Sequence, residues 1–174
     1  FEFQISATDV RPCRQCHDKV GHRSKMLGAV DVIYVDFSWA FGSVVHRKLL
    51  TKLSRLGINV ALFQWISAFL TNRMPNVVAE NTFSYWVNVV SGVPQGSVIG
   101  PILFLLFIND VIDISDSGTK ISLFADDIKI YSSIDNLDDC GSLQIALDKL
   151  AVWSETWQLS INIYKTHVSL AHWK

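Results

Sequence analysis

Asp126 and Asp127 are adjacent carboxylates that lie between two apolar, β-prone runs, at residues 122–125 and 128–131. This pattern predicts a β-hairpin with both aspartates at its tight turn. Two neighbouring carboxylates repel each other, and Mg²⁺ or Mn²⁺ offsets that repulsion because hard cations prefer carboxylate oxygens. A solvated acidic turn is the commoner explanation of an isolated Asp-Asp pair. The choice between the two therefore depends on the rest of the chain.

A third carboxylate, Asp36, follows a β-branched run at residues 30–35 that is typical of a buried strand. The expected order of strand, helices, hairpin, helix and strand is compatible with a split βαβ, or ferredoxin-like, sheet. In that sheet the end of the first strand lies beside the hairpin turn, so Asp36 would meet Asp126 and Asp127. Three such carboxylates can hold two divalent ions about 3.5–4 Å apart, as in enzymes that act on phosphates.

The remaining elements position this site. We expect a helix ending at Gly57, a helix capped by Asn59, a hairpin of 76–80 and 83–90 around residues 81–82, a Gly/Pro loop at 91–97, a helix through 102–108, a helix over about 138–157, and strands near 159–163 and 167–170. Residues 102–108 are apolar on every side, which predicts a helix buried all round.

Composition limits the possible classes of protein. With 174 residues, 49% hydrophobic content and a mean hydropathy of +0.27, the chain can bury a sizeable core. Its net charge is −1, so any nucleic-acid binding must come from local Lys and Arg groups. The longest apolar run, at residues 98–108, is too short to cross a bilayer. We therefore expect an intracellular protein with no membrane contact. Because it begins at Phe1, we also expect a piece of a longer one.

Three cysteines, Cys13, Cys16 and Cys140, make no disulfide framework and suit a reducing compartment. The spacing Cys13-Arg-Gln-Cys16-His17 matches a haem-attachment pattern, and with His22 it could form part of a zinc site. A structural zinc site needs four ligands and no second cysteine pair follows, so chance spacing is the better explanation.

Four segments carry specific patterns in a fixed order. They are YVDFSWAFGSV at 34–44, SGVPQGSVIGPILFLLFIND at 91–110, FADD at 124–127 and WQLSINIYKT at 157–166. Together they resemble the motifs of the reverse transcriptase domain of non-LTR (LINE-like) retrotransposons, over residues 30–165. The resemblance implies an α+β polymerase palm of ferredoxin-like fold, with helices on one face of an antiparallel sheet. It also implies partial fingers and no thumb, with residues 1–28 as a finger remnant and 29–174 as the palm.

The resemblance implies an RNA-directed DNA polymerase that uses two Mg²⁺ or Mn²⁺ ions, an RNA template, a DNA primer and deoxynucleoside triphosphates. Its catalytic and metal-binding residues would be Asp36, Asp126 and Asp127, with the Phe37 carbonyl nearby. Its nucleotide-binding residues would be Phe37, Ser38, Ala40, Phe41, Gln95, Gly96 and Lys165. Its nucleic-acid contacts would be Pro94, Gln95, Gly96, Phe124 and Ala125. For the parent element it implies activity in the nucleus.

Two of these residues carry roles with a clear physical basis. Phe41 occupies the position of an aromatic ring that would clash with a ribose 2′-hydroxyl and admit deoxyribose. Lys165 would neutralise or protonate the leaving phosphate.

Two positions depart from the family pattern, since Trp39 and Gly42 stand where Lys and Asp are usual. These departures indicate a decayed copy that is inactive alone. Two alternatives therefore stay open. One is a degenerate palm that only binds nucleic acid or a partner. The other is an RNA-templated polymerase of another lineage with a similar palm.

Overall fold

A four-stranded antiparallel sheet is the centre of the first of two compact units in this chain. The computed structural model describes residues 29–71, 73–80, 82–116, 118–134 and 137–172. The first unit takes in the residues described up to Ser38 and from Asp110 onward, and the second is Trp39–Asn109.

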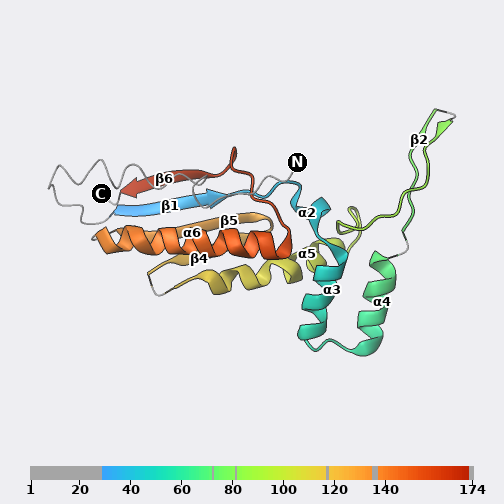
Figure 1. Cartoon of the computed structure of the whole chain (residues 1–174), viewed down its shortest axis with the longest axis horizontal. Helices are drawn as coiled ribbons and strands as arrows, with labels where there is room; N and C mark the ends of the chain where they lie inside the picture. Colours follow the sequence, from blue (N-terminus) through green and yellow to red (C-terminus); the bar gives the residue numbers. More distant parts are fainter. Residues whose placement is uncertain (1–28, 72, 81, 117, 135–136, 173–174) are drawn as a thin grey trace. The chain divides into compact units, whose positions relative to one another are not determined.

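The sheet contains β1 (Ala29–Val35), β4 (Lys120–Phe124), β5 (Asp127–Ile134) and β6 (His167–His172), in the order β4-β5-β1-β6 (Figure 1). All neighbouring strands are antiparallel. It follows that β1 and β4 run parallel with β5 between them, and β5 and β6 run parallel with β1 between them. These are two interleaved split βαβ units, so the ferredoxin-like prediction is confirmed.

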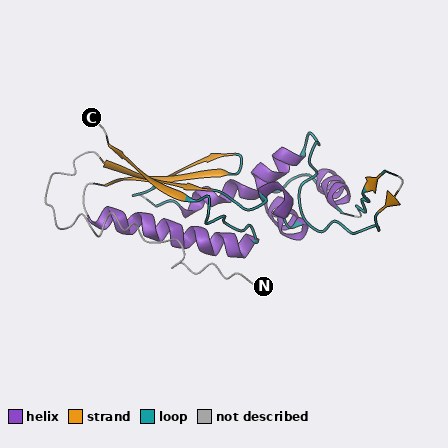
Figure 2. Ribbon diagram, turned by 90° about the horizontal axis from the view of Figure 1, so that it is seen from above, coloured by secondary structure: helices purple, strands orange, loops and turns teal. Residues whose placement is uncertain are grey.

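The helix α6 (Leu137–Trp157) lies along one face of this sheet (Figure 2). Side chains alternate along each strand, so one face of β1 and β5 carries the buried residues Ile33, Val35, Ile128 and Ile130. The apolar stripe of α6 is buried at Leu143, Leu147, Leu150 and Trp153. The helix predicted over about 138–157 is therefore present with one apolar face buried, and Trp157 at its end is half-buried.

The segment predicted as a strand at 159–163 forms only one bridge, between Ile161 and Phe37. A turn follows at once, because the Asn162 carbonyl accepts hydrogen bonds from the N–H groups of Lys165 (3.2 Å) and Thr166 (2.9 Å). This turn ends the pairing. The second predicted strand, near 167–170, is present as β6.

The second unit contains α2 (Ala40–Ser43), α3 (His46–Arg55), α4 (Val60–Leu70) and α5 (Gly100–Ile108). Gly57 has φ 65° and follows α3, as predicted for a helix stop. Asn59 caps α4, since its Oδ1 accepts a hydrogen bond from the Ala61 N–H at 2.8 Å. A 3₁₀ helix, η2 (Asn109–Ile114), begins at the last residue of this unit.

The prediction that residues 102–108 are buried all round is wrong. Ile102 is 53% exposed and Leu105 is 49% exposed, whereas Leu103, Phe104 and Phe107 are buried. The helix α3 packs against α5 within this unit. A short helix that is contacted on one side leaves its other apolar face in solvent.

The predicted hairpin is present but much shorter. It consists of β2 (Val78–Ala79) and β3 (Thr82–Phe83), and its turn begins at Glu80. Residues 84–90 are irregular instead of continuing as a strand. Both short strands are exposed, and an isolated two-stranded ribbon without a covered face gains little from lengthening.

Within the described ranges, no helix is both long and apolar enough to cross a membrane. The cysteine and histidine pattern at 13–22 lies outside those ranges. The division into residues 1–28 and 29–174 stays a prediction.

We predict that Ile130→Ala lowers the free energy of unfolding by about 2–5 kcal/mol, because Ile130 is fully buried between the sheet and α6. Ile145→Ala is the matched control, since Ile145 is 50% exposed on α6, and it should change stability by less than about 0.5 kcal/mol. Urea denaturation measures both. Equal changes in the free energy of unfolding for the two variants would contradict the assignment of Ile130 to the buried face of the sheet.

Candidate active site

Asp36 stands directly after β1, and the chain around 160–162 fixes its backbone. The Asn162 N–H donates to the Asp36 carbonyl at 2.8 Å, and the Ser38 N–H donates to the Ser160 carbonyl at 2.8 Å. Between them the Phe37 ring is buried, with its centroid 6.1 Å from that of Trp153. Asp36 is thus held at the end of a strand, a placement that fixes a side chain more precisely than a loop does.

The turn at Asn162 places the Lys165 side chain next to Asp36. Its Nζ lies 3.0 Å from Asp36 Oδ2, with the Lys165 side chain 70% exposed and that of Asp36 21% exposed. Oδ2 is buried, yet no hydrogen bond of good geometry reaches it. Because the lysine is largely in solvent, the ion pair contributes little to stability, about 0–1 kcal/mol. This carboxylate oxygen therefore remains available to another cation.

The turn between β4 and β5 consists of Ala125 and Asp126. Asp127 is the first residue of β5 and pairs with Phe124. The prediction of two aspartates in the turn is therefore correct for Asp126 and wrong by one residue for Asp127. Ala125 has φ 53°, a left-handed conformation that costs roughly 1–2 kcal/mol for a residue with a Cβ. The tight two-residue connection forces this conformation.

A pocket of about 550 Å³ lies where these strand ends meet. Asp36, Asp127 and Lys165 all line it, and so does Phe124. Asp126 is half-buried on the turn and is not part of the lining. The structure therefore brings two of the three predicted carboxylates, together with the predicted lysine, into one cavity.

Three further residues of this pocket were missed from the sequence. The rings of Tyr34 and His167 stack with centroids 4.9 Å apart, and Lys129 Nζ lies 5.5 Å from the Tyr34 centroid. Strand alternation could have found Lys129, because it stands between Ile128 and Ile130 and so faces away from the buried side. No comparable signal exists for His167, whose position depends on the pairing of β6 with β1.

The other predicted site residues lie in the second unit. Ala40 is buried, and the Phe41 ring stacks on Phe104 with centroids 4.3 Å apart. The Phe41 carbonyl accepts a hydrogen bond from the Val93 N–H at 2.8 Å, which ties α2 to the loop at 91–97. The structure thus places Phe41 next to the loop at 91–97. That Phe41 and this loop lie close to the carboxylates stays a prediction.

Within that loop Pro94 is buried, whereas Gln95 and Gly96 are exposed. Gly96 has φ 79°, where a side chain would be strained. A Cβ on Gly100 would lie 2.6 Å from the Pro94 carbonyl oxygen, so the loop and the start of α5 require glycine at that close approach.

The carboxylates have the right chemistry for divalent cations, since Mg²⁺ and Mn²⁺ take oxygen ligands and Asp36 Oδ2 is buried without a hydrogen bond. In the part of the chain that is described, no three acidic, His or Cys side chains converge on one point as they stand. Asp36 and Asp127 would hold an ion in the shared pocket, with Asp126 as the adjacent third donor.

A family model described as reverse transcriptase (RNA-dependent DNA polymerase) matches residues 2–174. The chain belongs to the reverse transcriptase family. Reverse transcriptases bind RNA templates and nucleotides and use divalent metal ions.

Curated relatives agree with this membership. The RNA-directed DNA polymerase from mobile element jockey of Drosophila funebris is 34% identical over 139 residues, which cover 76% of this chain and 15% of the relative. The probable RNA-directed DNA polymerase from transposon BS of Drosophila melanogaster is 31% identical over 143 residues, which cover 78% of this chain and 16% of the relative. The resemblance to non-LTR retrotransposon reverse transcriptases is thus confirmed. The chain spans about 15% of the length of these relatives.

Solved structures show the same fold. Telomerase from Candida tropicalis with a TWJ fragment of telomeric RNA superposes with a TM-score of 0.65 and 10% identity, over 97% of this chain and 30% of that one. Apo telomerase from the same organism, truncated from its C-terminal domain, gives 0.63 and 12%, over 97% of this chain and 35% of that one. At these identities the likeness concerns the fold alone.

We predict that Lys165→Gln raises the affinity of the chain for Mn²⁺ about threefold or more, because the Lys165 ammonium faces the Asp36 oxygen that a cation would need. Lys149→Gln is the control, since Lys149 forms a 2.7 Å ion pair with Asp116 outside the pocket. Calorimetric titration measures both. Equal affinities for the two variants would show that Lys165 does not compete for this site.

Proposed function

We propose that the protein of which this chain forms part is an RNA-directed DNA polymerase of a non-LTR retrotransposon, extending a DNA primer along an RNA template from deoxynucleoside triphosphates. The observation that supports this most is the shared pocket of Asp36 and Asp127, contributed by adjacent strands and faced by Lys165. Together with membership of the reverse transcriptase family, it favours two-metal nucleotidyl transfer over other phosphate chemistry.

In this proposal Asp36, Asp126 and Asp127 hold two Mg²⁺ or Mn²⁺ ions, with the Phe37 backbone carbonyl nearby. When bound, the ions activate the attacking hydroxyl and stabilise the charge on the leaving phosphate oxygens. The protein's own part is to fix the carboxylates on strand ends and to keep Lys165 where it can neutralise the triphosphate. Nuclear activity of the parent protein belongs to the same proposal.

The second unit supplies the selectivity in this proposal. Phe41 is held by its stack on Phe104 and would exclude a ribose 2′-hydroxyl. The exposed Gln95 and Gly96, with Pro94, would line the template and the nascent base pair, and the absence of a side chain at Gly96 allows close approach. Ser38 and Ala40 would contact the nucleotide, while Phe124 and Ala125 would contact nucleic acid.

A degenerate palm that binds nucleic acid without catalysis is the second candidate, and positions 39 and 42 favour it. A Cβ on Gly42 would meet no heavy atom within 4 Å, so the fold would accept the Asp that the family usually has there. Trp39 is 87% exposed and has φ 54°, so neither packing nor backbone geometry calls for a tryptophan. Both departures are thus losses that the fold does not require.

We predict that the chain binds Mn²⁺ and that Asp36→Asn or Asp126→Asn weakens this binding about tenfold or more, because each removes a charged oxygen ligand. Asp113→Asn is the control, as Asp113 is exposed in η2 outside the pocket and should leave the affinity unchanged. Electron paramagnetic resonance of free Mn²⁺ measures the binding. Unchanged affinity in both carboxylate variants would overturn the ligand assignment.

A further inference from the structure

The charges of the chain are divided unevenly between its two units. Trp39–Asn109 contains five Lys or Arg residues and a single carboxylate, Glu80, so its formal charge is +4, whereas the whole chain carries −1. A neutral total therefore conceals a basic second unit. A basic unit within a near-neutral chain is the electrostatic pattern expected of a surface that meets polyanions.

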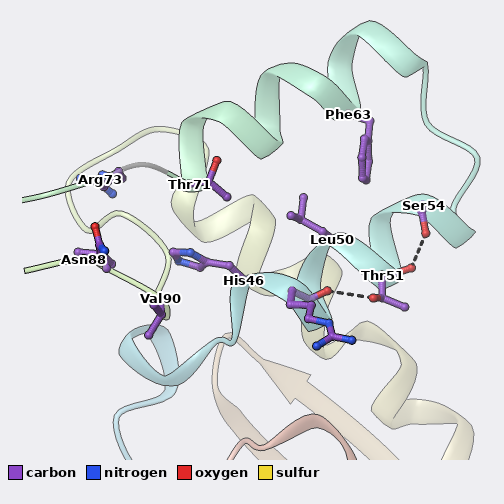
Figure 3. Close-up of a pocket in the computed structure, with 11 residues that line it drawn as sticks. His46, Leu50, Thr51, Ser54, Phe63, Thr71, Arg73, Asn88 and Val90 are labelled. Carbon is purple, nitrogen blue, oxygen red and sulfur yellow. Dashed lines mark hydrogen bonds between the residues drawn. The ribbon is translucent and has the colours of Figure 1, made fainter.

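A pocket of about 660 Å³ lies within this unit, along α3 (Figure 3). His46, Thr71, Arg73 and Asn88 gather at one end of it, and Phe63 lies at the other. Arg47 also lines it. None of the residues that line the pocket is acidic, so its two guanidinium groups have no carboxylate in the cavity to neutralise them.

The basic end of the pocket is held in place by backbone contacts. His46 is buried, and its Nε2 lies 2.7 Å from the Gly92 carbonyl oxygen; because a carbonyl only accepts, this nitrogen carries the proton. The Val89 N–H donates to the Arg73 carbonyl at 3.0 Å, which joins the two segments that bear Arg73 and Asn88. The Arg73 guanidinium also lies 6.0 Å from the Phe69 ring centroid.

An arm with exposed aromatic rings, formed by residues 73–80 and 82–90, begins at the basic end of the pocket. The segments that contain Arg73 and Val89 continue into the β2–β3 hairpin (Figure 1). On this arm Tyr85 is 92% exposed and Trp86 is 62% exposed. Exposed rings of this size next to a basic cavity are the two parts of a single-stranded nucleic-acid site, since bases stack on aromatic faces while cations hold the backbone.

We propose that this pocket binds a phosphate of a single-stranded nucleic-acid backbone, with neighbouring bases stacked on Tyr85 and Trp86. Arg47 and Arg73 supply charge and forked N–H donors, and the Asn88 amide supplies a neutral donor. The inference goes beyond the proposed polymerase function, because it needs neither a metal ion nor any carboxylate of the first unit. An acidic peptide would use the cations but would leave the aromatic arm unexplained.

The test is fluorescence anisotropy of the whole chain with a labelled single-stranded oligonucleotide of about 20 nucleotides, in EDTA. Arg47→Gln and Arg73→Gln should each weaken binding about three- to tenfold at moderate salt and make the slope of log affinity against log salt shallower by about 0.7. Arg55→Gln is the matched control: it removes the same charge from the end of α3 outside the pocket and should change affinity less than about twofold.

Trp86→Ala tests the proposed stacking of bases on the aromatic rings and should weaken oligonucleotide binding about fivefold or more. Its matched control is Trp65→Ala, because Trp65 is 53% exposed on α4 and does not line the pocket. Circular dichroism confirms that each variant is folded. Because the assay contains EDTA, no metal ion takes part in the measured binding, so loss of the metal site and loss of this site can be told apart.

Three results would overturn the proposal. The first is that the pocket arginine variants bind as well as Arg55→Gln. The second is that polyglutamate displaces the oligonucleotide as effectively as unlabelled oligonucleotide does, which would mean an acidic protein partner. The third is that inorganic phosphate does so at the same concentration, which would mean a small-anion site.

Discussion

The antiparallel pairing of β1 with β5 is the constraint on which the candidate active site depends. In its register Val35 lies opposite Ile128. Asp36 and Asp127 each stand one residue beyond that pair, at the same end of these two neighbouring strands. Residues far apart in the chain are thereby brought to one pocket. A slip of one residue would turn Ile128 and Ile130 from the buried face to the solvent face. Each buried isoleucine contributes about 1.5–3 kcal/mol, so the hydrophobic core also fixes the geometry of the carboxylates.

The ion pair between Lys165 and Asp36 adds a second layer to this arrangement. A turn anchored on the Asn162 carbonyl presents the lysine, and the same segment clamps the Asp36 backbone. One piece of chain therefore both positions the Asp36 carboxylate and supplies its counter-charge. Because the lysine is mostly in solvent, it can give way to a stronger cation at little cost in stability.

Much of the first unit could be predicted from the sequence, because its signals are local. The β-branched run before Asp36, the apolar stripe of α6 and the aspartates between two β-prone runs each follow from periodicity and composition. The strand order followed from the sequence of elements, and the motifs indicated the family. His167 could not be found in this way, since its place beside Tyr34 depends on long-range pairing of β6 with β1.

The second unit was predicted less well, for physical reasons. Periodicity gives no face to α5, whose residues are all apolar, so its exposed Ile102 and Leu105 could not be foreseen. Residues 84–90 have the composition of a strand but lack a neighbouring strand to pair with. The total charge also concealed the basic character of this unit, which becomes visible only once the chain is divided. The sequence alone shows that Trp39 and Gly42 depart from the family pattern. It does not show that the space around Gly42 would accept a side chain.

In the proposed metal site, Asp36 and Asp127 share one cation although they are far apart in sequence. Nuclear magnetic resonance of the isotope-labelled chain tests it directly, because bound Mn²⁺ broadens the amide signals of nearby residues. We predict that small amounts of Mn²⁺ broaden the signals of Asp36 and Phe37 together with those of Asp127 and Ile128. Broadening at only one of these strand ends, or first at exposed acidic residues such as Asp113 and Asp148, would contradict it.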